Sequence, residues 1–325
     1  MPGTNSIVVS RAMRVHWYRQ MCRIRAFERE IYEHNKKGLV RGTAHLYIGM
    51  EAIAVGACSA MHDGDLLTST HRGHGHAIAR GLDLGRMMAE VLGRSDGYCH
   101  GKGGSMHITD ISRGMLGADG IVGGGIPIAA GAALGMRLRG LSSVVFCFFG
   151  EGASNQGSFH EAVNFAAVNQ LAVIFICENN QWALSTAFKN TTAGGSVANR
   201  GTSYGIPGRQ LDGNDVEAVF GATQEAVVHA AGGAGPSLLE FVSYRWEPHS
   251  IFTRRETRPQ QEIDEWKKKD PIARYREVLI KTHGVPAVEL DELDSEVQAE
   301  VAKASAFALG SPAPNPEAAI QDVFA

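Results

Sequence analysis

Glu151 and Asn180 carry the two side chains whose types point most directly to chemistry in this sequence. Glu151 stands between two glycines, and Asn180 ends a short polar run that follows an apolar one. A carboxylate and an amide oxygen are hard ligands that suit Mg²⁺ or Ca²⁺, with phosphate oxygens, a backbone carbonyl and water filling the remaining positions. A helix beginning after Gly152 would point backbone N–H groups at the same place and favour an anion. The alternative is an ordinary crossover with a solvated glutamate and a capping asparagine.

Two apolar runs would position these residues. Residues 144–149 (VVFCFF) and 172–177 (AVIFIC) are continuous and rich in β-formers, which is typical of strands buried on both faces. Between them, apolar residues recur at four-residue spacing from 159 to 167, which indicates a helix with one apolar face. This βαβ unit predicts parallel strands joined by a right-handed crossover. Their carboxyl ends then meet at one edge of the sheet, which brings the carboxylate and the amide together.

A second polar group follows the predicted strand 65–69. It contains His71 and Arg72, then His74 and His76 among glycines, a composition that suits a site loop at a strand end. The planar fork of donors on an arginine fits phosphate oxygens. Two histidines without a third partner are weak grounds for a metal site.

Residues 97–110 form a glycine-rich segment that is too irregular for a strand. Ser105 and His107 in this segment could hydrogen-bond a substrate. The alternative is that its glycines only allow a compact loop. Further glycines at 117–125 precede a predicted helix of small residues over 126–136, and these residues would let neighbouring helices pack closely.

The sequence around Glu151 resembles a known cofactor motif. Its GEG, followed after residues 153–178 by two asparagines, is similar to the thiamine diphosphate (ThDP) motif usually written GDG…NN. The longer stretch GEGASNQGSFHEAVN…ENN resembles the α subunits of 2-oxo acid and acetoin dehydrogenases, the E1 components, and the resemblance covers roughly residues 21–280. Glu151 replaces the aspartate of most members but keeps its charge and ligand type. The resemblance implies an α/β, ThDP-binding fold with a mostly parallel central sheet flanked by helices.

The resemblance also implies roles for individual residues. Mg²⁺ would be held by Glu151, Asn180 and the backbone carbonyl of Trp182, which occupies a tyrosine position. Arg72 would hold the terminal phosphate of ThDP. Further cofactor contacts would come from His71, Gly120, Val122, Gly152, Ala153 and His249. Candidate proton donors or substrate binders are His45, His107 and His249, the first of which lies in a stretch similar to the family's HLYxGQEA.

Two departures from the family bear on the substrate. His71 replaces the tyrosine of pyruvate-type members, and the segment THRGHGH is most similar to that of acetoin-type members. Pro248 stands where the family commonly has glycine, and residues 251–258 lack its Asp-Pro. This arginine-rich segment could contact substrate or partner, or it could be a solvated basic loop.

The function implied by the resemblance is that of the α subunit of a ThDP- and Mg²⁺-dependent E1 enzyme. Such an enzyme cleaves acetoin or a pyruvate-like 2-oxo acid and passes the fragment to a lipoyl E2 or another acceptor. The glutamate that faces the cofactor's pyrimidine comes from a β subunit in two-chain members, so an α₂β₂ heterotetramer is expected. Glu51 is the nearest replacement in this chain. The alternatives are a ThDP carboligase that feeds no E2, and a non-catalytic phosphate-binding scaffold.

Composition narrows the class of protein. The 325 residues carry a net charge of −3 with a pI near 6.5, which gives no reason to expect binding to nucleic acid or to an anionic membrane. Five cysteines without paired or metal-ligand spacing fit a reducing compartment, and a cytoplasmic location is expected. We expect no signal peptide and no span long enough for a bilayer.

Three segments are expected along the chain. A helical N-terminal arm should occupy residues 1–40, with its helix over about 10–37. The ThDP diphosphate-binding α/β domain should follow over 41–255, with its last strand at 237–243. A helical C-terminal tail should complete the chain over 256–325, frayed after residue 309.

Overall fold

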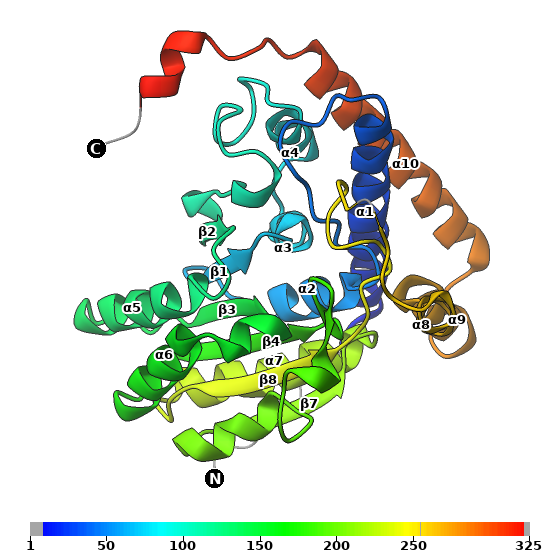
Figure 1. Cartoon of the computed structure of the whole chain (residues 1–325). Helices are drawn as coiled ribbons and strands as arrows, with labels where there is room; N and C mark the ends of the chain where they lie inside the picture. Colours follow the sequence, from blue (N-terminus) through cyan, green and yellow to red (C-terminus); the bar gives the residue numbers. More distant parts are fainter. Residues whose placement is uncertain (1–8, 254, 322–325) are drawn as a thin grey trace.

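Six strands form one central sheet in the computed structural model, which describes residues 9–253 and 255–321 (Figure 1). The strands lie in the order β2-β1-β3-β4-β8-β7, and every neighbouring pair is parallel. Their bounds are β1 Leu66–Thr70, β2 Met115–Asp119, β3 Val145–Gly150, β4 Val173–Asn179, β7 Gly208–Asp212 and β8 Ser237–Val242. A separate antiparallel pair joins β5 (Trp182–Ala183) to β6 (Thr186–Ala187). The expected α/β class and parallel sheet are confirmed.

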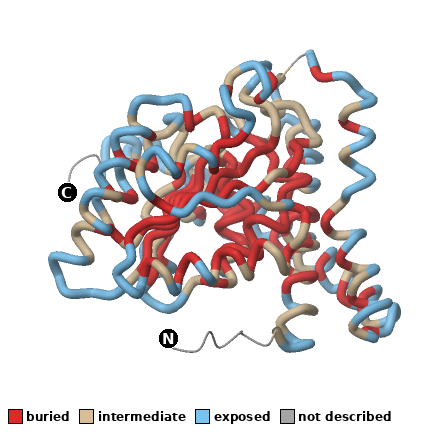
Figure 2. Tube along the Cα trace, turned by 90° about the horizontal axis from the view of Figure 1, so that it is seen from below, coloured by how far each residue is buried: buried red, intermediate tan, exposed pale blue. Residues whose placement is uncertain are grey.

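Helices cover both faces of this sheet. In chain order they are α1 Arg11–Lys36, α2 Glu51–Ser59, α3 His74–Ala79, α4 Leu84–Val91, α5 Gly125–Leu138, α6 Gly157–Val168, α7 Val216–Ala231, α8 Gln260–Lys267, α9 Pro271–Lys281 and α10 Ala287–Gly310. The α5 and α6 helices pack on one face, and α2 and α7 pack on the other together with α1. Figure 2 shows the buried residues concentrated in the sheet between these layers.

The β3 strand shows why the central apolar runs are continuous. Phe146 and Phe148 point into the cluster that includes α2 and α7, while Val145, Cys147 and Phe149 point into the cluster formed with α5 and α6. Successive strand residues face opposite sides, so a strand covered on both sides needs an apolar residue at every position.

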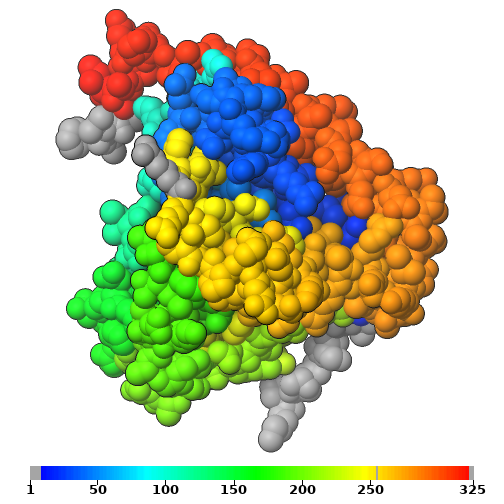
Figure 3. Space-filling view, turned by 45° about the vertical axis from the view of Figure 1, so that its right-hand side comes forward, coloured from blue at the N-terminus to red at the C-terminus, as the bar shows by residue number. Residues whose placement is uncertain are grey.

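The first long helix and the C-terminal helices pack together on one side of the molecule. Figure 3 shows the N-terminal helix in blue beside the C-terminal helices in orange, and α1 packs along α10. A buried ion pair ties these parts together, since Arg25 of α1 contacts Glu51 of α2 and also bonds Asp270 at 3.1 Å. The domain boundaries expected at 40/41 and 255/256 stay a prediction.

The structure differs from the sequence-based predictions in three places. The two central strands, the last strand β8, the α5 helix and the long first helix lie where they were expected. β2 and β7 were not expected, because both are edge strands without a continuous apolar run, and four of the five residues of β7 are exposed. The helix predicted to begin after Gly152 begins at Gly157, because a 3₁₀ turn over Glu151–Asn155 comes first. The tail residues 1–8 and 322–325 lie outside the described residues.

Two further observations concern the class of protein. All five cysteines are free. Among the described helices, none is both long and apolar enough to cross a membrane.

Packing of β3 gives a stability prediction. Replacing the fully buried Phe146 by alanine should lower the free energy of unfolding by about 3–5 kcal/mol, because it leaves a cavity between the sheet and its helices. Urea denaturation of the full chain measures this loss. The matched control is Phe165→Ala on α6, where the side chain is 42% exposed and the loss should stay below about 1 kcal/mol. Equal losses in the two variants would contradict this account of the core.

Candidate functional site

The sheet order reverses between β1 and β3, because the chain continues from β1 to β2 on one side and then returns to β3 on the other. In open α/β sheets a ligand crevice forms outside the carboxyl ends of the strands at such a reversal. A cavity of about 300 Å³ lies here. Nine of the residues implied by the resemblance line it: His71, Arg72, Val122, Glu151, Gly152, Ala153, Asn180, Trp182 and His249.

Glu151 and Asn180 are brought together by the register of the two central strands. Gly150 at the end of β3 pairs with Glu178 in β4, so the residues just beyond each strand are neighbours. The Asn180 backbone N–H donates to Glu151 Oε2 at 3.2 Å, and the Asn180 side-chain oxygen accepts from the Trp182 N–H at 3.3 Å. Carboxylate, amide and the 182 backbone therefore surround one end of the cavity, which is the donor set expected for a hard cation.

Burial sets the electrostatics of Glu151. Its residue exposure is only 2%, and desolvation raises the pKa of its carboxyl to about 7, while the N–H of Asn180 and the positive charges of Arg245 and Arg72 oppose that rise. No side-chain cation forms an ion pair with it among the described residues. A divalent cation at this point would supply the missing charge.

Two buried arginines lie at the cavity: Arg72 lines it, and Arg245 contacts the lining residue His249. Arg72 donates to the carbonyl oxygens of Leu46 at 2.6 Å and His249 at 3.2 Å, and Arg245 bonds the His249 ring at 2.9 Å. Burial lowers the pKa of Arg72 to about 10 and that of Arg245 to about 9, so both stay charged at neutral pH. The cavity thus carries positive charge suited to an anionic group such as a diphosphate.

The sequence interpretation missed Arg245, which lies next to the cavity against His249. It follows the buried β8 strand, so its position just after a strand end was an available signal. Its neighbour Arg258 was interpreted only as part of a basic segment, yet it is buried and donates to the carbonyl oxygens of Trp246 at 3.3 Å and Glu247 at 2.8 Å. Arg258 therefore shapes the divergent 246–258 loop and is not a solvated charge.

Three histidines come together from distant parts of the chain. The ring centroid of His45 lies 4.6 Å from that of His71 and 4.8 Å from that of His249. Desolvation, followed by the charge of Arg72, lowers the pKa of each ring, to about 2, 3 and 4 for His45, His71 and His249. Their ring nitrogens are close enough for a shared metal, but the two adjacent guanidinium groups oppose a cation there. Neutral imidazoles can instead donate and accept hydrogen bonds at neutral pH.

The structure places other expected residues outside the cavity lining. His107 and Gly120 lie next to one another, since a Cβ on Gly120 would be 3.7 Å from His107 Nε2, but neither lines the cavity. Ser105 is buried and bonds the ring of His74 at 3.0 Å. Glu51 is fully buried in its ion pair with Arg25, so it is not available to a cofactor in the cavity.

Comparison with known proteins settles the family. The model of the family described as "Dehydrogenase E1 component" matches residues 19–317. The chain belongs to the dehydrogenase E1 component family. The resemblance stated from the sequence is confirmed, and the chain is an enzyme component of that family.

E1 relatives match almost the whole chain. The α subunits of acetoin:2,6-dichlorophenolindophenol oxidoreductase from Bacillus subtilis and Cupriavidus necator are each 44% identical over 94% of this chain and 92% of their own length. The pyruvate dehydrogenase E1 component subunit α of Rhizobium meliloti is 38% identical over 94% of this chain and 88% of its own. The E1 family implies ThDP, and a cavity lined by the buried carboxylate of Glu151 and the guanidinium of Arg72 fits a metal-bound diphosphate.

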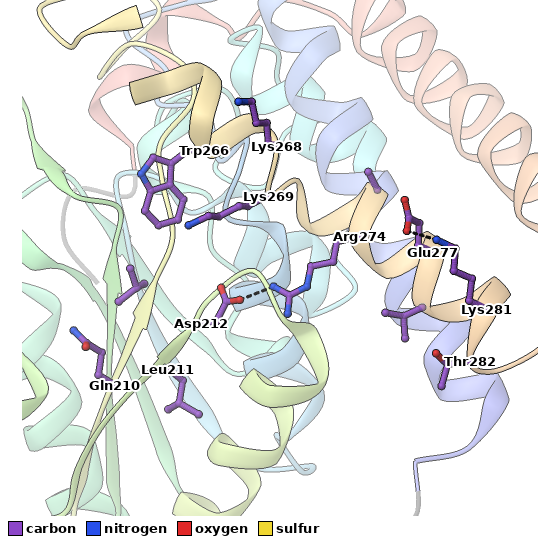
Figure 4. A pocket seen from close by; sticks show the side chains of 13 residues that line it. Gln210, Leu211, Asp212, Trp266, Lys268, Lys269, Arg274, Glu277, Lys281 and Thr282 are labelled. Atoms are coloured by element: carbon purple, nitrogen blue, oxygen red, sulfur yellow. Dashed lines mark hydrogen bonds and ion pairs between the residues drawn. The ribbon is translucent and has the colours of Figure 1, made fainter. Parts of the chain in front are cut away.

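A larger hollow elsewhere does not compete with this site. A cleft of about 930 Å³ lies between β7 and the helices α8 and α9 (Figure 4). It is a wide surface groove with two ion pairs in its lining, Arg274 with Asp212 and Lys281 with Glu277 at 2.7 Å, and with the further basic residues Lys268 and Lys269. The groove lies away from the strand reversal at which the E1 site forms.

The raised pKa of Glu151 gives a pH-dependent prediction for this E1 chain. A metal-free Glu151→Gln variant should melt at a higher temperature than the parent chain at pH 8, because glutamine removes the cost of burying an ionised carboxylate. The free-energy cost of burying the carboxylate reaches its full size above pH 7, the pKa of Glu151 in the folded chain. It disappears as the pH falls through 4.5, the ordinary pKa of a glutamate, because the carboxyl is then protonated in both the folded and the unfolded chain. Thermal melting between pH 4 and pH 8 without metal measures the gain.

The exposed Glu161→Gln change on α6 serves as the control, since it removes the same charge from solvent. It should leave the melting temperature nearly unchanged at every pH. Equal melting temperatures of Glu151→Gln and the parent at pH 8 would contradict the raised pKa assigned to the buried Glu151 carboxyl.

Proposed function

We propose that this chain is the α subunit of a ThDP- and Mg²⁺-dependent E1 enzyme that cleaves acetoin or a pyruvate-like 2-oxo acid. It would pass the resulting fragment to a lipoyl E2 or another acceptor. The observation that carries the proposal is the meeting of Glu151, Asn180 and the Trp182 backbone in the lining of a cavity that Arg72 also lines. The free cysteines support a reducing, cytoplasmic location.

Different residues of the cavity would bind different parts of the cofactor. Glu151, Asn180 and the Trp182 carbonyl would hold Mg²⁺, and the metal with Arg72 would neutralise the diphosphate. The Gly152 and Ala153 segment lines the same end. Backbone groups of Gly120 and Val122 would bind the pyrimidine end. When bound, ThDP supplies a nucleophilic carbon and an electron sink for cleavage of the bond next to a carbonyl.

The histidines are the proposed substrate contacts. His45, His71 and His249 form a neutral cluster with edge-to-face ring contacts beside Arg72. Such a cluster can bind a hydroxyl or carbonyl oxygen and transfer a proton without first losing one. His107 is also kept as a proposed substrate contact, because its ring adjoins the Gly120 segment.

The proposal of a partner subunit is supported by a group of exposed apolar residues in the cavity lining. Ile121, Val122 and Leu184 line it and are 72%, 51% and 60% exposed. Exposed apolar side chains grouped around a site mark a binding surface. The cavity's other lining acid, Asp119, bonds the Ile121 N–H at 2.7 Å. The carboxylate that activates the pyrimidine would therefore come from a β subunit, in an α₂β₂ assembly.

This leads to a reconstitution prediction. The chain purified alone should bind ThDP weakly and show no turnover, because half of the cofactor would be uncovered. Co-expression with its β subunit should restore tight, Mg²⁺-dependent binding in calorimetry and turnover with 2,6-dichlorophenolindophenol as electron acceptor. Turnover by a monomer of this chain alone would refute the two-chain proposal.

The same experiment separates the alternatives. A complex that joins two carbonyl fragments but reduces neither the dye nor a lipoyl E2 would be a carboligase. A complex that binds ThDP without turnover on any 2-oxo acid or acetoin would be a scaffold. Reduction of a lipoyl E2 in the presence of acetoin or pyruvate supports the E1 proposal in full.

The substrate proposal gives a second prediction. His71→Tyr, which installs the residue of pyruvate-type members, should lower kcat/KM for acetoin relative to pyruvate by about tenfold or more, since it removes a neutral ring nitrogen from the cluster. Steady-state kinetics of the complex with both substrates measure this ratio. His62→Tyr is the control, because the His62 side chain is 64% exposed and outside the cavity. An unchanged ratio in His71→Tyr would remove this residue from substrate selection.

A further inference from the structure

Glu90 is a fully buried carboxylate near the end of α4 that lies outside the site described above. It forms no ion pair with a side chain among the described residues. Both of its oxygens instead accept backbone N–H groups of the glycine-rich loop that follows α4. Oε2 accepts from Cys99 at 2.8 Å and Gly101 at 2.9 Å, and Oε1 accepts from Gly103 and Gly104, both at 2.9 Å.

These four bonds explain how a buried carboxyl group is tolerated here. The amide N–H groups replace the hydrogen bonds to water that its oxygens have lost on burial. The pattern is that of a backbone nest folded around an anion. In this nest the anion is a side chain of the protein, so the loop takes its shape from Glu90.

The glycines of the loop fit this arrangement closely. Gly101 and Gly104 have φ angles of +75° and +65°, in the left-handed region that side chains rarely adopt. A Cβ on Gly97 would lie 2.3 Å from Glu90 Oε2. The glycine-rich composition is therefore needed for the backbone to close around the carboxylate, and it is more than a means of making a compact loop.

The loop carries two residues with contacts to the site region. Directly after Gly104, a 3₁₀ turn holds Ser105 and His107. Ser105 bonds the ring of His74, and His107 bonds the Ala118 carbonyl at 3.1 Å, next to the Gly120 segment. A change in the backbone at 104 would therefore move both side chains.

The segment that follows α10 contacts the same loop through hydrogen bonds. After α10 the chain returns toward the loop, where the Ser95 N–H donates to the Pro312 carbonyl at 3.0 Å and Lys102 Nζ donates to the Ala318 carbonyl at 3.4 Å. Figure 1 shows this last segment in red, beyond the loop that joins α4 to β2. Glu90 is the contact on the inner side.

We propose that Glu90 is a positioning residue of the enzyme. Its carboxylate fixes the backbone over residues 97–104 and through it places Ser105 and His107 beside the 118–123 segment. The structural part of the proposal stands on the four hydrogen bonds. Its effect on turnover rests on the proposed function.

The test uses Glu90→Gln in the complex with the β subunit. Glutamine keeps the size of the side chain, but its NH₂ group faces two N–H donors and cannot accept from them. Hydrogen exchange followed by mass spectrometry should show exchange over residues 97–104 accelerated by about tenfold or more, with little change elsewhere. kcat should fall by about tenfold or more while the Kd for ThDP with Mg²⁺ changes little, because displacement of a contact group affects the reaction geometry.

The matched control is Asp96→Asn, which removes the same charge from an exposed residue of the same loop. It should leave both exchange and kcat as in the parent. If Glu90→Gln does not fold, Glu90→Asp keeps the charge but withdraws the carboxylate from the loop N–H groups by one methylene, and it should give the same two effects.

The outcomes separate this inference from the proposed function. Exchange is measurable in a complex that turns over none of the substrates, so accelerated exchange there supports the structural part while the E1 proposal fails. Unchanged exchange in the folded variant overturns the inference. Accelerated exchange with unchanged kcat overturns the positioning role.

Discussion

Ionisable groups buried around the parallel sheet impose the main constraint on this structure. Each needs compensation without water. Arg25 and Glu51 compensate one another, Glu90 is held by four backbone N–H groups, and Glu240 accepts from Asn179, Ser196 and the Ala198 N–H. Glu151 accepts from the Asn180 N–H at 3.2 Å and is further offset by the charges of Arg245 and Arg72, with which it forms no ion pair. The most weakly compensated of these carboxylates is thus the one that the fold presents to the proposed cation.

The fold could be predicted where burial leaves a pattern in the sequence. β3 and β4 were found because both faces are covered, so apolar residues are continuous. β2 and β7 were missed because edge strands need no such run, and β7 is largely exposed. The start of α6 was misplaced because a 3₁₀ turn and an α-helix share their early residue preferences.

The candidate site was predictable to a different extent. Glu151, Asn180 and Arg72 follow strands, so topology alone brings them to one edge, and the family motif supports them. Arg245 and Glu90 were missed because their partners are largely backbone groups of segments that have no side-chain signature. The three histidines could not be joined by spacing, since the ring contacts link residues 45, 71 and 249 through the tertiary fold.

Trp182 gives the protein a built-in optical signal. Its backbone lies at the proposed metal position, the residue is part of the cavity lining, and its indole Nε1 bonds Glu262 of α8 at 2.9 Å. Indole emission depends on the polarity and hydrogen bonding of the ring. The other tryptophans lie elsewhere, with Trp17 against Phe220, Trp246 under Arg25 and Trp266 stacked on Tyr244. Filling of the cavity should therefore be visible in the fluorescence of the unlabelled chain, through the one tryptophan that lines it.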